Sequence, residues 1–350
     1  MSRKRVKKKT FCLVVPWMAL GGADRCGLDV LSYYKSKGYR AVVIATKHNP
    51  LTHHQTQAFA TVADAIYTEE DMLATIQEEA PDIVLINNSH HAYQYLAGIK
   101  KVAPACKLFA LMHMLLPHPW DFEEYLKKGF AKVDGVITVS NKLKADLAEK
   151  GIRKKVYPLH WFGFKGDGLS FSRELSNRIL CPMRLETQKR PEFIPLVAEK
   201  MRALIPTAKF IITGSGYMED RVKEVAVERG VMDMLEFTGE IPLDEMEAQY
   251  TKAGAVLCPS RDEGIPLIYY EAMQRGVPLA ASKVGAVGEV VPPEYLIEFE
   301  ASDEAYLYAE LLAKHLMKYT IEHVVNTSIR VSRDFSHGKW AERLAAIMGR

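Results

Sequence analysis

Short apolar runs alternate with segments of helical pattern along most of the chain. In the first half, six apolar runs predict strands, at 10–17, 40–47, 65–68, 81–90, 107–114 and 133–140. The pattern of the segments between them, such as 72–80, predicts helices or loops that lead into helices. Regular alternation of strand and helix indicates an α/β domain built on a parallel sheet.

A second series of apolar runs predicts strands at 177–184, 208–216, 235–241, 255–260 and 277–285. Between the two series, the segment 157–175 is rich in glycine and aromatic residues and has no clear period, which indicates a connection between domains. We therefore predict two doubly wound α/β domains, at 10–165 and 176–330. Ligands of such sheets bind beyond the carboxyl ends of the strands, so we expect the two domains to share one cleft.

The stretch 261–278 predicts a short helix that carries one unusual charge. Pro266 suits the first helical position, and Gly276 suits the position just past the end. The helix between them is apolar on nearly all sides, which is typical of a buried helix, yet it contains Glu271. A buried carboxylate needs a partner, because leaving it unpaired costs several kcal/mol.

Two interpretations of the acids in this stretch are equally open. In one, Glu263, on the loop before the helix, and Glu271 form part of a binding or catalytic site. In the other, Glu263 is an acid that the dipole at the helix N-terminus favours, and Glu271 is one half of a core ion pair, with Arg275 as a candidate partner. The rest of the chain has to decide between them.

Length and composition place the protein in a broad class. The chain has 350 residues, 48% of them hydrophobic, which is enough for two domains with cores of their own. Its five cysteines are scattered, odd in number and without the spacing of a metal site, which favours a reducing compartment. No apolar run is long enough to cross a membrane, and no signal peptide precedes the first strand. These features predict a cytoplasmic protein.

The charge of the chain is concentrated at its start. The net charge is +3, but six of the first nine residues are basic. Without these six, the remaining 40 of the 46 Lys and Arg residues are outnumbered by the 43 Asp and Glu residues. The body is therefore not a nucleic-acid binder by charge. A basic tail over 1–9 is suited to peripheral contact with anionic lipid, although a disordered, solubilising start is the favoured alternative. Its basic residues are Arg3, Lys4, Arg5, Lys7, Lys8 and Lys9.

Several candidate site residues follow predicted strands. Gly21 and Gly22 follow the first strand, where they allow close backbone approach and lead into a helix N-terminus that favours anions. Arg184 and Lys189 flank the loop after the first strand of the second series and suit a diphosphate, although for these residues alone an ordinary solvated basic surface is the preferred explanation. His113 closes the strand at 107–114.

Other common nucleotide sites are excluded or weakened by the sequence. Gly214 and Gly216 lie at a strand end, but Glu219 occupies the place of the third glycine of a dinucleotide fingerprint. The chain has no Walker P-loop and no D-x-D sequence, and its histidine pairs lack a third ligand at metal spacing. We therefore expect no metal and consider an oxidoreductase the weakest interpretation.

The ordered set of motifs resembles the retaining glycosyltransferases of family 4, which have the GT-B fold of two Rossmann-like domains. The set comprises "GGADR", "VITVSNKLKADL", "MRLETQKRPE", "GSG", "FTGEI" and "PSRDEGIPLIYYEAMQRGVPLAASKVGAVGEVV". The resemblance covers most of the chain and is strongest over 180–291. The spacing of Glu263 and Glu271 is similar to the E-x7-E motif of this family.

The resemblance implies a role for each candidate. Glu263 would contact hydroxyls of the donor sugar, and Glu271 the ribose of a UDP- or GDP-sugar. Arg184 and Lys189 would stabilise the diphosphate leaving group, and His113 would lie near the reacting centre. The segment 331–350 would cross back to the first domain. The remaining donor-binding positions implied are Gly21, Gly22, Gly214, Gly216, Gly264, Ile265, Pro266 and Leu267.

The implied reaction is hexosyl transfer with retention, without a metal or a dedicated protein base, to a glycan, lipid-linked or small-molecule acceptor. It would belong to polysaccharide or glycoconjugate synthesis. The chain departs from the family pattern at Arg190, where a glycine often follows the lysine, and at the bulky Tyr269 and Tyr270. A nucleotide-sugar epimerase on the same architecture and a non-catalytic nucleotide-sugar or glycan-binding module remain alternatives.

Overall fold

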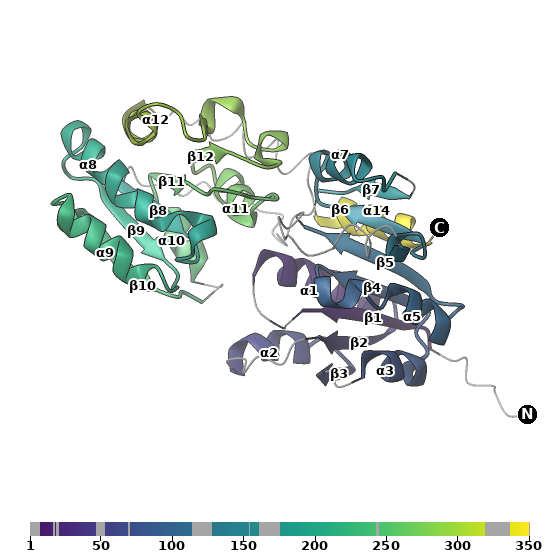
Figure 1. Ribbon diagram of the computed structural model, residues 1–350. Helices are drawn as coiled ribbons and strands as arrows, with labels where there is room; N and C mark the ends of the chain where they lie inside the picture. Colours follow the sequence, from purple (N-terminus) through teal and green to yellow (C-terminus); the bar gives the residue numbers. More distant parts are fainter. Residues whose placement is uncertain are drawn as a thin grey trace, which may run out of the picture. The chain divides into compact units, whose positions relative to one another are not determined.

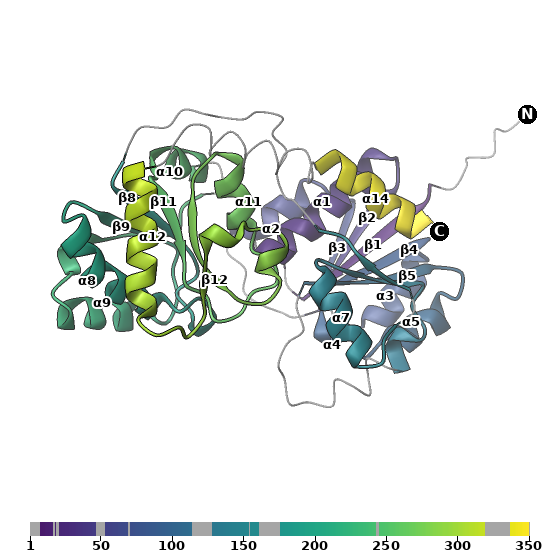
Figure 2. The same ribbon diagram turned by 90° about the horizontal axis from the view of Figure 1, so that it is seen from above.

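The computed structural model describes residues 8–16, 18, 21–46, 53–68, 71–113, 128–153, 155–160, 176–242, 245–318 and 337–349. The chain divides into two compact units, Met1–Gly163 joined by His337–Arg350, and Phe164–Ser336. Each unit contains one sheet with helices packed on it (Figures 1 and 2). The division falls within the glycine- and aromatic-rich segment, most of which lies outside the described residues.

The first unit is built on a parallel seven-stranded sheet in the order β3-β2-β1-β4-β5-β6-β7. Its central strands are buried on both faces, as the uninterrupted burial of Phe11 to Val15 shows, and this explains their unbroken apolar sequence. All six strands predicted in this half are present. The strands are β1 (Thr10–Val15), β2 (Arg40–Ala45), β3 (Ala65–Thr68), β4 (Ile83–Asn87), β5 (Lys107–Met112), β6 (Gly135–Thr138) and β7 (Val156–Pro158).

The helices of the first unit begin at residues that cap them. Side chains of Asp71, Ser89 and Ser140 accept hydrogen bonds from the first turns of three helices. The last helix of the chain belongs to this unit, and Lys107 Nζ donates to the main-chain oxygen of Gly349 at 2.6 Å. The helices are α1 (Gly22–Ser36), α2 (His53–Ala60), α3 (Met72–Glu79), α4 (His90–Tyr93), α5 (Leu96–Val102), α7 (Asn141–Glu149) and α14 (His337–Gly349).

The second unit repeats this plan with a parallel six-stranded sheet in the order β10-β9-β8-β11-β12-β13. The five predicted strands are present, and their apolar side chains pack with those of the helices into one core that includes Ile179, Phe210 and Leu257. The strands are β8 (Arg178–Pro182), β9 (Lys209–Thr213), β10 (Leu235–Gly239), β11 (Ala255–Cys258), β12 (Leu279–Lys283) and β13 (Leu296–Glu298).

Five α-helices and several short 3-10 turns connect these strands in the described part of the second unit. The α-helices are α8 (Ile194–Leu204), α9 (Glu219–Glu228), α10 (Met246–Lys252), α11 (Leu267–Gln274) and α12 (Glu304–Lys318). The 3-10 turns are η1 (Thr187–Lys189), η2 (Pro191–Phe193), η3 (Met232–Met234), η4 (Val287–Glu289) and η5 (Pro293–Tyr295).

The strand order fixes where a ligand can bind. In each sheet the first strand of the chain lies inside, the next two strands add to one side of it, and the later strands add to the other side. The direction of addition therefore reverses between β1 and β4 and between β8 and β11, and each of these places is a switch point. Crevices for ligands open at the carboxyl ends of the strands at such switch points. The residues that follow these strands are therefore the first place to look for function.

Two details differ from the sequence predictions. Pro266 is the cap before α11 and not its first residue, because its ψ of 138° is extended. Gly276 lies just past the helix with a left-handed φ of 66°, as predicted. The short strands β7 and β13 were not predicted, because three-residue strands carry too few positions to show a period.

Candidate functional site

The switch point of the second unit holds a close ion pair between a half-buried lysine and a buried glutamate. Lys189 ends η1 in the loop after β8, and Glu263 lies in the loop after β11. Lys189 Nζ donates to Glu263 Oε1 at 2.5 Å, and the two side chains are only 16% and 6% exposed. Each charge compensates the desolvation of the other, since a buried charge without a partner is strongly unfavourable. The pair thus presents a cation and a carboxylate at one point of the sheet edge.

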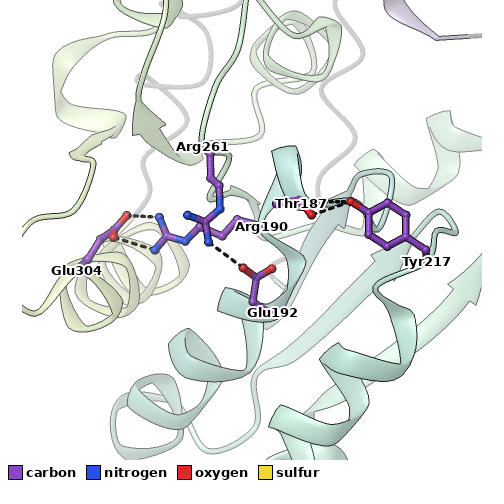
Figure 3. Close-up of polar contacts among 6 residues, drawn as sticks. All are labelled: Thr187, Arg190, Glu192, Tyr217, Arg261 and Glu304. Atoms are coloured by element: carbon purple, nitrogen blue, oxygen red, sulfur yellow. Dashed lines mark hydrogen bonds and ion pairs between the residues drawn. The ribbon is translucent and has the colours of Figure 1, made fainter. Parts of the chain in front are cut away.

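The two loops that carry this pair are joined to each other by hydrogen bonds of Gln188, one from its side chain and one to its main-chain oxygen. Gln188 Nε2 donates to the main-chain oxygen of Asp262 at 2.9 Å, and the main-chain N–H of Arg261 donates to the oxygen of Gln188 at 2.9 Å. A further ion pair joins Arg261 to Glu192 at 3.1 Å (Figure 3). These contacts fix the loop after β8 against the loop after β11.

The loop that follows β12 is in close contact with the backbone of Glu263. Gly285 has a φ of 55°, and a Cβ atom added to it would lie 1.7 Å from the main-chain oxygen of Glu263. No side chain can be accommodated at this distance, so glycine is required here for both backbone conformation and space. The position of the Glu263 backbone therefore depends on Gly285.

Glu271 lies on α11 and is held by a tyrosine. The hydroxyl of Tyr250, at the end of α10, donates to Glu271 Oε2 at 2.8 Å. Burial first, and then the charge of Glu271, raise the pKa of Tyr250 well above its usual value, so the hydroxyl stays a donor. Arg275 donates to the main-chain oxygen of Glu271 at 2.9 Å and forms an ion pair with Glu247.

Tyr250 was not found by sequence reasoning. It precedes Glu271 by 21 residues, and no spacing rule connects two residues on separate helices. The only feature that marks Tyr250 in the sequence is that it is an aromatic residue near the end of a polar helix.

The other predicted donor-binding residues of this unit lie around the same strand ends. Gly264, Ile265 and Pro266 are half-buried between Glu263 and α11, and Leu267 is buried. Their predicted contact with a donor stays a prediction.

The backbone structure of the loop after β9 requires glycine at positions 214 and 216, independently of any ligand. Both have positive φ angles, and a Cβ atom would lie 2.1 Å from the oxygen of Met183 or 2.3 Å from that of Leu185. The two glycines therefore let the loop after β9 run directly against the loop after β8.

Arg184 is placed differently from Lys189. Its side chain is 60% exposed and forms an ion pair with Glu186 at 2.7 Å. The structure thus brings Lys189 and Glu263 into direct contact, whereas Arg184 binds a carboxylate of its own loop. An exposed ion pair of this kind contributes little to stability, so the guanidinium can exchange partners easily.

The switch point of the first unit holds Gly21, Gly22 and a polar network. Gly21 caps α1, Gly22 is its first residue, and the main-chain N–H of Gly21 donates to the carboxylate of Asp24 at 3.2 Å. At the end of β4, the buried Asn87 donates through Nδ2 to the main-chain oxygen of Ala23 at 2.7 Å. The amide of Asn87 is thereby fixed against the first turn of α1.

Asn87 also determines which ring nitrogen of His113 carries the proton. The half-buried His113 lies just after β5, with Nε2 at 3.0 Å from Asn87 Oδ1. Since the oxygen of Ala23 can only accept, Asn87 presents its own oxygen to the imidazole, and Nε2 must carry the proton. Desolvation of the ring lowers the pKa of His113 to about 4. The imidazole is therefore neutral near pH 7, with Nδ1 as the acceptor nitrogen.

Asn87 is a second residue that sequence reasoning missed, because its position against α1 and His113 comes from the strand order and not from a motif. Within the described ranges, no group of three His, Cys, Asp or Glu side chains could hold a metal ion. None of the helices in those ranges is long and apolar enough to cross a membrane. The basic residues of the tail before Lys8 lie outside the described residues.

Two family profiles cover most of the chain. "Glycosyl transferases group 1" matches residues 170–318 and "Glycosyltransferase Family 4" matches residues 20–160. The chain is therefore a GT-B protein of the family 4 type of glycosyltransferases.

The relatives are similar over part of their length. A GDP-mannose-dependent alpha-(1-6)-phosphatidylinositol monomannoside mannosyltransferase from Mycolicibacterium smegmatis is 28% identical over 120 residues, 32% of this chain and 31% of that protein. An uncharacterized glycosyltransferase from Methanocaldococcus jannaschii is 32% identical over 120 residues, 33% of this chain and 30% of that protein. The matched region thus spans about a third of these relatives.

Solved structures show the same fold over nearly the whole chain. A mutant of S. aureus TarM in complex with fondaparinux, alpha-GlcNAc-glycerol and UDP has a TM-score of 0.81 at 11% identity, over 98% of this chain and all of that chain. HepE from Anabaena in complex with UDP-glucose has a TM-score of 0.78 at 16% identity, over 97% of this chain and 99% of that chain. At these identities the likeness concerns the fold alone.

Proposed function

We propose that this protein is a retaining, metal-independent glycosyltransferase that moves a hexosyl group from a UDP- or GDP-sugar to a glycan, lipid-linked or small-molecule acceptor. The observation that carries the proposal is the buried pair of Lys189 and Glu263 at the switch point, with Glu271 on the adjacent helix. The names of similar proteins support the donor class, since one mannosyltransferase is GDP-mannose-dependent and HepE was solved with UDP-glucose.

The ion pair suits a donor that carries both phosphates and sugar hydroxyls. A diphosphate competes with Glu263 for Lys189, while a sugar hydroxyl donates to the carboxylate of Glu263. Lys189, with the exposed Arg184 turning from Glu186, then neutralises the charge that grows on the departing diphosphate. Fixed charges of this kind commonly lower the barrier by several kcal/mol, and they take over the role that a metal has in other nucleotide-sugar enzymes.

The other polar groups have complementary roles in this proposal. Glu271 accepts hydrogen bonds from the ribose hydroxyls, with Tyr250 holding its second oxygen in place. His113 is neutral and accepts a hydrogen bond from a hydroxyl at Nδ1. Retention follows a route in which the leaving phosphate takes the proton of the acceptor, so that no protein base is required. Lys8 and Lys9 are exposed at the start of β1 and, with the tail before them, serve peripheral contact with the cytoplasmic membrane face.

The donor site is tested by thermal melting with UDP, GDP, ADP and CMP, for the wild type and for Glu271→Ala. A ligand at 100 times its dissociation constant adds about 2.7 kcal/mol of stability. We expect one nucleotide to raise the midpoint of the wild type only, and the sugar transferred to come from a donor with that base. If no nucleotide at millimolar concentration raises the midpoint, the proposed donor site is wrong.

Turnover then separates the proposal from its alternatives. A glycosyltransferase releases the nucleoside diphosphate only in the presence of an acceptor, and the product keeps the anomeric configuration of the donor. Formation of an epimerised sugar product from the donor alone, without acceptor, would indicate an epimerase instead. Binding of a nucleotide sugar without any turnover would indicate a binding module.

A further inference from the structure

The residue after Lys189 has a backbone conformation that is unfavourable for it. Arg190 lies between η1 and η2 with φ 54° and ψ 49°, in the left-handed region. The Cβ atom of a non-glycine residue is crowded in this region. The following residue, Pro191, restricts Arg190 further, because its ring disfavours helical conformations in the residue before it. The strain is therefore located directly beside the lysine of the candidate site.

The side chain of Arg190 has contacts that hold this conformation in place. Its Nη1 and Nη2 donate to the two oxygens of Glu304 at 3.1 and 2.7 Å (Figure 3). Both residues are buried, with 7% and 8% of their surface exposed. The guanidinium also stacks on Phe193, with 3.7 Å between its central carbon and the ring centroid. A bidentate pair that also stacks specifies both the position and the plane of the guanidinium.

Glu304 provides a rigid point of attachment. It is the first residue of α12, whose 15 residues pack on β11 and β12 and against α8. One turn later, the hydroxyl of Tyr308 hydrogen-bonds Ser282 on β12 at 2.8 Å. Near the other end, His315 Nε2 hydrogen-bonds the main-chain oxygen of Leu279 at 2.9 Å. The carboxylate of Glu304 is thus fixed to the sheet.

We propose that Arg190 and Glu304 are positioning residues that direct Lys189 toward the donor diphosphate, an inference that rests on the proposed function. The side chain of Arg190 is fixed to α12, so its backbone keeps the left-handed turn that sets the direction of the preceding residue. The hydrogen bonds that Gln188 forms with the main chain of Arg261 and Asp262 fix the other side of Lys189. Neither Arg190 nor Glu304 touches the donor in this proposal.

Stability alone is a poor explanation for this arrangement. Replacing a buried ion pair by apolar groups is often neutral or stabilising, and glycine would adopt the backbone conformation of residue 190 without strain. Strained residues that the surroundings hold in place are typical of functional sites. The combination of strain, burial and adjacency to Lys189 therefore points to positioning.

The test compares Glu304→Gln, the double variant R190A/E304Q, Lys189→Ala and the triple variant K189A/R190A/E304Q. The double variant removes both charges together, so neither is left buried and unpaired, and alanine at 190 cannot hold the left-handed turn through contacts with α12. Glu298→Gln, which breaks the exposed pair of Lys283 and Glu298 on β13, is the matched control. For each variant the melting midpoint, the dissociation constant of the nucleoside diphosphate and the rate of sugar transfer are measured.

We expect R190A/E304Q to transfer sugar about tenfold to a hundredfold more slowly than the wild type, since misplacement of a reacting group by about 1 Å has effects of this size. Glu298→Gln keeps the wild-type rate. In the absence of Lys189, the same two substitutions cause no further loss of rate, because residues that act through one group are not additive.

Two results would overturn the inference. A wild-type rate in R190A/E304Q would show that the pair does not position Lys189. An equal fold-loss with and without Lys189 would show that the pair acts on folding or on another group. The proposed function fails separately, if Lys189→Ala itself transfers sugar at the wild-type rate.

Discussion

Replacing Gly285 by alanine should uncouple the Glu263 loop from the sheet. The added Cβ would lie 1.7 Å from the main-chain oxygen of Glu263, whereas real Cβ contacts are essentially never shorter than 3.0 Å. One of the two loops must therefore move by at least 1.3 Å, the difference between these distances. The carboxylate of Glu263 moves with its backbone and loses its alignment with Lys189.

The expected effects on stability and rate have different sizes. A left-handed conformation costs a non-glycine residue about 1–2 kcal/mol, which lowers the melting midpoint by roughly 2–8 °C in a unit of this size. Displacement of a reacting group by about 1 Å lowers the rate by about a hundredfold. The collision adds a further cost of about 1–3 kcal/mol in stability, so the rate is measured where the variant is still folded and its loss reports the displaced loop. The assay is initial-rate sugar transfer at saturating donor, below the melting midpoint.

Gly230→Ala is the control for this prediction. Gly230 also belongs to the second unit and has a φ of 63°, but no atom lies within 4 Å of its added Cβ. It carries the same conformational cost without the collision, so it should lose less stability than Gly285→Ala and keep the wild-type rate. If the two variants transfer sugar equally fast, the position of the Glu263 backbone does not govern the reaction, and the reasoning from Gly285 is wrong.

Three further predictions follow from the candidate site. Tyr250→Phe removes one hydrogen bond to Glu271 and should weaken nucleoside diphosphate binding by about tenfold, with little change in the rate at saturating donor; an unchanged dissociation constant in a titration would contradict it. The pKa of His113 is about 4 in the folded protein and about 6.5 in unfolded chains. Between these pH values the unfolded state binds more protons than the folded state. The free energy of unfolding contributed by this residue is therefore complete above pH 6.5 and falls as the pH decreases toward 4. Asn87→Asp places a carboxylate on Nε2 and should raise that pKa, so the transfer rate should decline at a higher pH than in the wild type; superimposable pH profiles would exclude this role of Asn87. Treatment with EDTA should leave the transfer rate unchanged, and a loss that added Mg²⁺ or Mn²⁺ restores would show that the reaction needs a metal.

The sequence was sufficient for the parts of the fold that depend on local pattern. Unbroken apolar runs such as the one from Phe11 to Val15 predict strands buried on both faces, and eleven predicted runs became strands of two parallel sheets. Motif spacing likewise singles out Glu263 and Glu271 from the sequence alone. Such features are predictable because each depends on residues that are neighbours along the chain or along one helix.

What the sequence could not predict depends on contacts across elements. Asn87 meets His113 and Ala23 only because β4 lies between β1 and β5 in the sheet. Glu304 meets Arg190 across 114 positions of the chain. In the sequence, Arg190 stood out only because the family pattern often has a glycine at this position. Its left-handed backbone explains why glycine is common at such a turn.

The two switch points are built for different chemistry, which is a further argument for the proposed reaction. In the second unit, Lys189 and Glu263 are a largely buried pair of opposite charges, which in the proposed function a diphosphate and a sugar hydroxyl separate. In the first unit, the hydrogen-bonded groups of Asn87 and His113 are uncharged near pH 7, because the pKa of His113 is about 4. A neutral acceptor nitrogen suits a hydroxyl better than a phosphate, since it has no proton to offer an anion. A reaction that joins a phosphate-bearing donor to a hydroxyl-bearing acceptor uses both kinds of site.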